Sequence, residues 1–106
     1  MTTVRSIFDR MPGTFLKDKA AGMNAVIQFD ITGEGGGRWY AAIVDGDLTV
    51  REGTHEGSRL TLSASAQDYI DISTGKLSDQ LAFMTGRIRA TGDLALAMKM
   101  QSIFKR

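Results

Sequence analysis

The chain has 106 residues with 13 Lys and Arg against 12 Asp and Glu, a formal net charge of +1, and it contains no cysteine. This length fits one domain, residues 1–106, with a sizeable core, and the balanced charge argues against a nucleic-acid partner. The lack of cysteine excludes disulfides and thiolate metal sites. With no apolar run long enough to cross a membrane and no signal-peptide pattern, we expect a cytoplasmic protein. We expect no cofactor.

Residues 3–21 are predicted to form two short helices. Thr3 can cap the first, on which apolar side chains recur at i, i+3, i+4 and i+7. These side chains are Val4, Ile7, Phe8 and Met11. Pro12 and Gly13 are expected to end this helix, because proline lacks the backbone donor that a helix needs. Residues 15–21 predict the second helix.

The middle of the chain is predicted to form strands. Residues 23–31 alternate between apolar and polar side chains, which indicates a strand with one buried face. Residues 38–44 predict the next strand, and the Asp-Gly pair at 45–46 is typical of a two-residue hairpin turn. Further strands are expected at residues 47–51 and 59–63. We therefore expect an antiparallel meander in this part of the fold.

The rest of the chain is predicted to contain three helices and one more strand. Ser65 and Ser78 each begin a helix, because their hydroxyls can accept hydrogen bonds from the first turn. Residues 87–90 form a short strand, and Asp93 caps the last helix. One face of that helix carries Leu96, Met100, Ile103 and Phe104, and a second apolar row carries Leu94 and Met98. A helix with two apolar rows is either sandwiched or lines a space that an apolar guest can occupy.

The closing segment resembles the C-terminal signature of the sterol carrier protein 2 family of lipid-binding domains. The matching stretch, residues 86–101, reads GRIRATGDLALAMKMQ. The resemblance continues in GKL at residues 75–77, in QLAFM at 80–84 and in AAGMNAVIQFD at 20–30. Each piece alone is a weak pattern, but the ordered set covers almost the whole chain and is specific.

The resemblance implies an α+β fold, in which a five-stranded, mixed, twisted sheet carries helices packed on one face. The helices and the sheet would enclose a hydrophobic tunnel that holds the ligand. The order of the predicted elements agrees with such a layered fold. Because two helices separate the fifth strand from the others, we expect it to join the sheet as a parallel neighbour through a crossover.

The predicted lipid-contacting residues combine this resemblance with side-chain chemistry. Met84 and Met98 are read as tunnel wall rather than core, since methionine adapts to flexible guests, whereas Met100 is read as core. Gln80 and Gln101 are included because relatives carry glutamines at the matching places, close to the bound lipid. The complete predicted set is Trp39, Ile43, Ile72, Leu77, Gln80, Phe83, Met84, Leu94, Ala97, Met98 and Gln101.

No group of residues predicts catalysis. His55 lies in a polar loop without an evident orienting partner, and no second histidine is present to build a metal site. The glycine-rich stretch 33–37 is followed by a strand rather than a helix, so we expect a hairpin loop and not a phosphate site. Arg87 and Arg89 are expected on the solvated face of a strand, with contact to anionic head groups as the alternative.

These features predict a soluble carrier that holds a fatty acid, a fatty acyl-CoA or a sterol-like lipid, and no enzyme. About ten buried methylenes at ~0.8 kcal/mol each supply roughly 8 kcal/mol, which corresponds to a Kd of ~1 μM before ordering costs. The alternative is a protein-interaction or substrate-presenting module with a vestigial tunnel, and transient contact with a membrane surface or an enzyme is expected. A co-purifying lipid favours the carrier, whereas a collapsed core with an exposed apolar patch favours the module.

Overall fold

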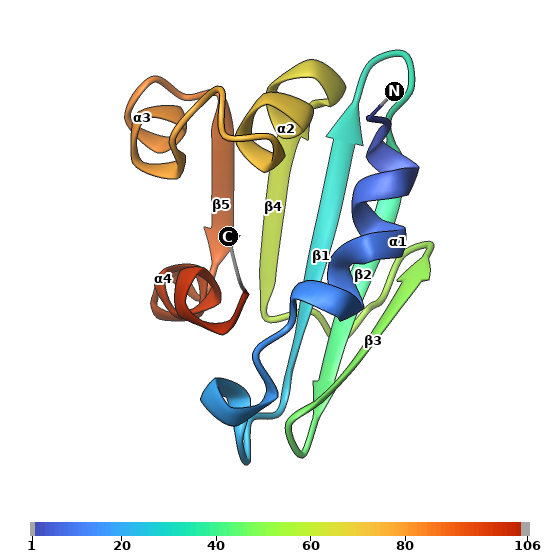
Figure 1. The fold of residues 1–106 in the computed structure, drawn as a ribbon, viewed down its shortest axis with the longest axis vertical. Coiled ribbons are helices and arrows are strands. Elements are labelled where there is room, and N and C mark those ends of the chain that lie inside the picture. Colours follow the sequence, from blue (N-terminus) through green and yellow to red (C-terminus); the bar gives the residue numbers. More distant parts are fainter. Residues whose placement is uncertain (1, 105–106) are drawn as a thin grey trace.

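The structure, a computed structural model, describes residues 2–104 and, for Gln101, the backbone alone. Helices and strands alternate in blocks along the chain (Figure 1). They are α1 (Val4–Thr14), η1 (Lys17–Ala20), β1 (Ala25–Thr32), β2 (Gly37–Val44), β3 (Asp47–Glu52), β4 (Leu60–Ser65), α2 (Ala66–Ser73), α3 (Asp79–Met84), β5 (Ile88–Gly92) and α4 (Leu94–Ile103).

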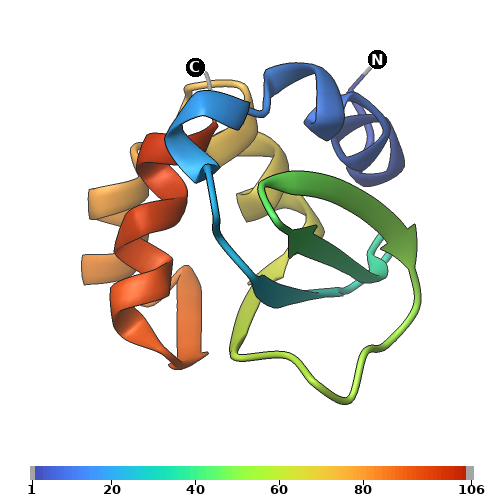
Figure 2. The same cartoon turned by 90° about the horizontal axis from the view of Figure 1, so that it is seen from below.

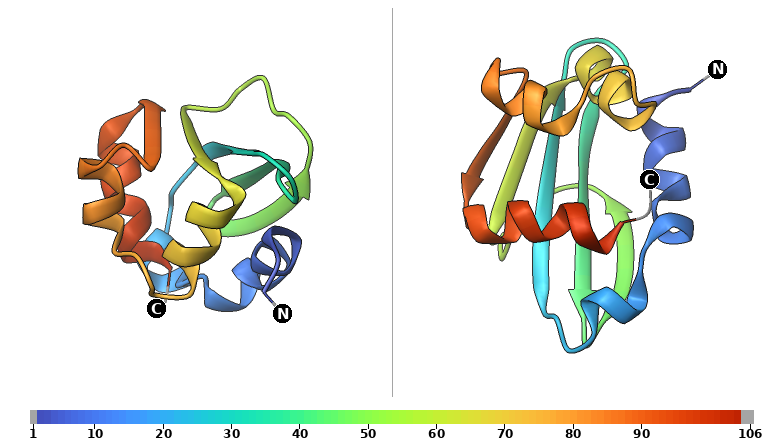
Figure 3. Two further views of the ribbon diagram at one scale, coloured as in Figure 1. Left: turned by 90° about the horizontal axis from the view of Figure 1, so that it is seen from above. Right: turned by 60° about the vertical axis from the view of Figure 1, so that its left-hand side comes forward.

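Within residues 2–104 the strands form one mixed sheet in the order β3-β2-β1-β4-β5. The α-helices cover one of its faces, and α4 lies across the strands (Figure 3). The expected α+β fold with a five-stranded mixed sheet is therefore confirmed. The predicted hairpin is confirmed too, because Asp45 and Gly46 both have positive φ, 50° and 82°, as a two-residue turn between twisted strands requires.

The expected neighbours of two strands are wrong. We expected an antiparallel meander with β5 as the parallel strand, but β4 pairs with β1 in parallel and β5 pairs with β4 antiparallel. The alternation of apolar and polar residues shows which side chains of a strand share a face of the sheet, but it does not show which strand lies beside it. Since β3 ends at one edge of the sheet, the chain must cross the sheet before β4 can begin beside β1.

Gln28 of β1 holds this crossing segment, residues 53–59. The segment runs over the face of the sheet opposite the helices (Figure 2). The Gln28 amide is 4% exposed; it donates to the carbonyls of Trp39 and Gly53, both at 3.1 Å, and accepts from the backbone N–H of His55 at 2.9 Å. Because the amide oxygen and nitrogen of Gln28 both have hydrogen-bond partners, its burial carries little penalty in free energy and fixes the path of the loop.

The predicted caps are confirmed, whereas the end of the first helix is not where we expected it. The side chains of Thr3, Ser65, Ser78 and Asp93 each accept a hydrogen bond of 3.1 Å from the third residue that follows. Helix α1 continues through Pro12 to Thr14, because a proline in the last turn removes only one helical hydrogen bond. The second helix shrinks to the 3-10 turn η1, since Phe15 is extended and pairs with Phe104.

Candidate functional site

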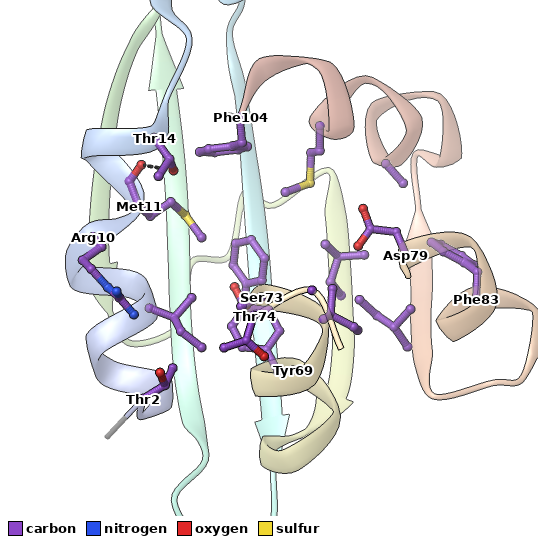
Figure 4. A pocket seen from close by; sticks show the side chains of 18 residues that line it. Thr2, Arg10, Met11, Thr14, Tyr69, Ser73, Thr74, Asp79, Phe83 and Phe104 are labelled. Atoms are coloured by element: carbon purple, nitrogen blue, oxygen red, sulfur yellow. Dashed lines mark hydrogen bonds between the residues drawn. The ribbon is translucent and has the colours of Figure 1, made fainter. Parts of the chain in front are cut away.

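A cavity of about 700 Å³ lies between the helices and the sheet (Figure 4). Its size falls within the range of pockets that take small-molecule ligands. The floor comes from neighbouring strands, with Phe29 of β1, Leu62 of β4 and Ile88 of β5. Phe29 and Leu62 are register partners in the parallel pair, so both side chains point to the same face. Strand alternation therefore supplies an apolar floor.

Helices form the walls of this cavity. Ile7 and Met11 face it from α1, and Ala97 and Met100 face it from α4. Figure 4 shows Met11 on α1 and Phe83 on α3 on opposite sides of the space. Helices α1 and α4 lie over different parts of the sheet (Figure 1). The apolar side chains that they present line a cavity between them.

A cluster of stacked aromatic rings lies beside the cavity, and two of its members, Phe29 and Tyr69, line it. Phe8 of α1 is buried and stacks on Trp39 at 4.7 Å between ring centroids and on Tyr69 at 5.3 Å. Phe29 meets Phe8 and Tyr69 edge-on, at 5.1 and 6.1 Å. Such pairs stabilise beyond their buried area. Burial raises the pKa of the Tyr69 hydroxyl, which stays neutral at ordinary pH.

A second contact beside the cavity is the latch, which we define as Phe15, Leu16, Ile103 and Phe104. The Leu16 N–H donates to the Ile103 carbonyl at 2.7 Å. The rings of Phe15 and Phe104 lie 5.6 Å apart and their backbones form a β-bridge. Phe104 also lines the cavity (Figure 4). The latch therefore joins the end of α4 to the segment that follows α1.

The rim of the cavity is polar. Arg10, Thr14, Ser73, Thr74 and Asp79 lie along it (Figure 4). The hydroxyl of Thr14 donates to the Met11 carbonyl at 2.9 Å, and that of Thr74 donates to the Ile70 carbonyl at 2.8 Å. Arg10 is exposed and supplies a positive charge at the rim. The arrangement is an apolar interior with polar groups at its edge.

The structure brings only some of the predicted site residues to this cavity. Ile72, Phe83 and Ala97 line it. Trp39, Ile43 and Leu77 are buried but do not line it. Gln80, Met84, Leu94 and Met98 are exposed on α3 and α4, and the side chain of Gln101 lies outside the described residues. Lipid contact by any of these residues stays a prediction.

The placement expected for one of the two rows of α4 is wrong. We expected Leu94 and Met98 to face the ligand space, but they are 57% and 74% exposed. The reason is the position of α4 over the outer part of the sheet, which leaves one flank of the helix without a neighbour (Figure 1). Met100 packs against the core, as expected, and it also lines the cavity. Periodicity identifies an apolar row but not its surroundings.

Sequence reasoning missed most of the lining. The apolar residues of the lining were interpreted as ordinary core or were not considered, because core residues and cavity walls share the same periodic pattern. Tyr69 offered a signal that we did not use, since it places a polar atom in an otherwise apolar helical row. The missed lining residues with large side chains are Ile7, Arg10, Met11, Phe29, Leu62, Tyr69, Ile88, Met100 and Phe104.

The groups with reactive side chains have structural surroundings. The ring of His55 accepts a hydrogen bond from the Gly57 N–H at 2.9 Å and packs 5.1 Å from Tyr40, in the loop on the face opposite the helices. Among the described residues there is no cluster of three or more His, Cys, Asp or Glu side chains that could hold a metal ion. A search of the same residues finds no helix long and apolar enough to cross a membrane.

Comparison with protein families matches residues 7–105 to the SCP-2 sterol transfer family. The chain belongs to this family. Bovine hydroxysteroid dehydrogenase-like protein 2 is 28% identical over 102 residues, which cover 94% of this chain and 24% of that protein. Mouse peroxisomal multifunctional enzyme type 2 is 35% identical over 85 residues, which cover 77% of this chain and 12% of that protein. The chain thus spans a quarter or less of these relatives.

Solved structures of the SCP-2 family share the fold. The solution structure of palmitated SCP2L2 from Aedes aegypti has a TM-score of 0.80 and 24% identity, covering 96% of this chain and 94% of that one. This likeness shows a shared fold, and in this SCP-2 domain the cavity lies between the helices and the sheet.

Proposed function

We propose that this SCP-2 domain binds one long-chain lipid in the cavity between its helices and its sheet, and carries it in exchangeable form. The observation that carries the proposal is the largely apolar interior of about 700 Å³, with charged groups at its rim, in a chain of a sterol transfer family. A fatty acid, a fatty acyl-CoA or a sterol-like lipid fits this chemistry. The palmitated relative supports a fatty acid.

The driving force is the transfer of an apolar chain out of water. About ten buried methylenes at ~0.8 kcal/mol each supply roughly 8 kcal/mol before ordering costs. We propose that Ile72, Phe83 and Ala97 contact this chain, together with Met11 and Met100. The two methionines suit guests of different shape, because methionine is unbranched and polarisable. We propose further that the lipid occupies a continuous tunnel and that the carrier acts in the cytoplasm.

Lipid extraction and titration test this function. The purified protein is extracted and analysed by mass spectrometry, then stripped of lipid and titrated with a fluorescent fatty acid. We expect a co-purifying long-chain lipid and a micromolar or tighter Kd. Ala97→Trp, which fills the cavity, should weaken binding at least tenfold, whereas Ala95→Trp on the exposed side of the same helix should not. A protein that yields no lipid and binds no probe would contradict the proposal.

A second candidate function is presentation of the lipid to an enzyme. It is favoured by an apolar patch, defined as Leu81, Met84, Leu94 and Met98, that lies exposed on α3 and α4. The curated relatives carry the matching segment in longer proteins named as a dehydrogenase-like protein and a multifunctional enzyme, which fits docking on an enzyme domain. We infer that the SCP-2 domain itself supplies no catalytic group, since His55 lies away from the cavity.

The patch and the cavity can be tested separately. Replacing Met84 and Met98 with Glu should leave fatty-acid affinity unchanged, because neither side chain lines the cavity. If the presenting role is right, the same change should lower the rate at which an enzyme of the relatives' kind uses lipid delivered by this domain. An unchanged delivery rate would remove this second candidate.

A further inference from the structure

Tyr69 is the buried polar side chain of the cavity. It is 7% exposed and lines the space together with Phe29 and Ile72. Its ring is held in place by stacking on Phe8 at 5.3 Å, with an interplanar angle of 12°, and by the edge contact with Phe29. The position of its hydroxyl is therefore fixed by packing and not by a hydrogen bond.

Among the described residues, no side chain or backbone group forms a hydrogen bond with the Tyr69 hydroxyl. The rim residues behave differently, because Thr14 and Thr74 each donate to a backbone carbonyl of their own helix. Among the described residues, Asp30 Oδ1 is the one fully buried side-chain atom without a hydrogen-bond partner, so the Tyr69 hydroxyl keeps some accessible surface, where water or a ligand can satisfy it. The hydroxyl faces a space whose contents can supply the partner that the fold does not.

We propose that the Tyr69 hydroxyl donates a hydrogen bond to an uncharged oxygen of the bound lipid, so that this SCP-2 domain selects lipids with a hydroxyl or carbonyl at that depth over plain hydrocarbon chains. The inference rests on the proposed lipid-binding function and adds the class of lipid. A phenol held in an apolar wall recognises a hydroxyl or carbonyl by the same contact, since both oxygens accept a hydrogen bond.

The charges described around the cavity disfavour a carboxylate as the partner of Tyr69. Within residues 2–104, the ionisable groups that line the cavity besides Tyr69 are Arg10 and Asp79, and Arg10 is exposed at the rim. An ionised carboxylate beside Tyr69 would be buried with no cation among these lining groups beside it, which is strongly unfavourable. A charged head group therefore stays at the rim, where Arg10 and solvent are available. The oxygen that reaches Tyr69 is a neutral one, further along the lipid.

Positional isomers of one fatty acid test this selection. Stearic acid and its monohydroxy and mono-oxo isomers compete with a fluorescent fatty acid for the lipid-free protein. In a purely apolar cavity every isomer should bind more weakly than stearic acid, because each buries an extra oxygen without a partner. We expect instead that isomers with the oxygen at one narrow range of positions bind about five- to tenfold more tightly than stearic acid, as one good hydrogen bond allows.

The matched variants are Tyr69→Phe and Tyr40→Phe, which remove the hydroxyl from the two tyrosines of the chain. Tyr69→Phe should erase the preference while leaving the affinity for stearic acid within about twofold and the urea midpoint unchanged, since its hydroxyl has no partner to lose. Tyr40→Phe should leave both the preference and the affinity unchanged, because Tyr40 packs on His55 of the loop on the face opposite the helices. A preference that survives in Tyr69→Phe, or isomers that all bind more weakly than stearic acid, would overturn the inference. Failure of stearic acid and every isomer to bind would instead overturn the proposed function.

Discussion

The two sides of the helical layer differ in how completely they are packed. Under α1, the side chains of Val4, Phe8 and Trp39 are buried and the aromatic rings stack. Around α3 and α4, large apolar side chains such as Met84 and Met98 are exposed by three quarters. A domain that admits a lipid, as proposed, would need one well-packed side and one that can move without unfolding the rest. By burial, the α1 side is the well-packed one and the α3–α4 side is the more loosely packed one.

The largest expected effect tests the well-packed side. Phe8→Ala removes a ring that contacts Phe29, Trp39 and Tyr69, so it should lower the free energy of unfolding by about 3–5 kcal/mol in urea titration. Phe83→Ala serves as the matched change on the more loosely packed side. Because Phe83 is 40% exposed, its loss should cost less than about 1.5 kcal/mol and act mainly on lipid affinity. Equal costs for the two changes would remove the distinction between the sides.

A smaller effect is expected from filling the cavity at α4. Met100→Trp should weaken binding of a fluorescent fatty acid at least tenfold, about 1.4 kcal/mol, because the indole occupies ligand space. Met98→Trp should spare both affinity and stability, since Met98 points to solvent. If Met98→Trp were the change that weakened binding, the two rows of α4 would face opposite ways from those in the structure.

The smallest effect concerns pH and the start of α4. The Asp93 carboxylate accepts the Leu96 N–H and pairs with Arg59 at 2.6 Å, and these contacts hold the pKa of Asp93 below its usual value. A depressed pKa in the folded state gives stability that is present above the unfolded pKa of about 3.9 and is lost as pH falls through the folded pKa. Asp93→Asn keeps the cap and should flatten this part of the stability profile in acid. An identical profile in the variant would show that Asp93 contributes nothing there.

Most helices and strands could be predicted from the sequence, but the pairing of the strands in the sheet could not. Caps such as Ser78 and Asp93, the turn at Asp45 and Gly46, and the alternation of β1 are local patterns with local causes, and the structure has them. The parallel pairing of β1 with β4 depends on the loop that Gln28 holds, a contact between positions far apart in the chain. No periodic pattern reports such a contact.

The candidate site was harder to predict than the fold for a related reason. A helical row that packs and a row that lines a cavity are both apolar, so Met98 and Met100 could not be told apart until their surroundings were known. Phe83 and Ala97 were placed at the site by resemblance to relatives, not by pattern. Tyr69 illustrates a useful signal. A polar side chain within an otherwise apolar helical row breaks the pattern of a packed core, and such exceptions are expected at binding sites.

The latch has a consequence for the speed of exchange. Phe104 both lines the cavity and forms the ring pair with Phe15, and a hydrogen bond from the Leu16 N–H to the Ile103 carbonyl adds to this contact. If the proposed lipid leaves past the latch, its residence time should depend on how often the last turn of α4 opens, whereas its affinity should depend on the cavity walls. A change at Phe15 would then alter loading and release in the same proportion and leave the equilibrium untouched.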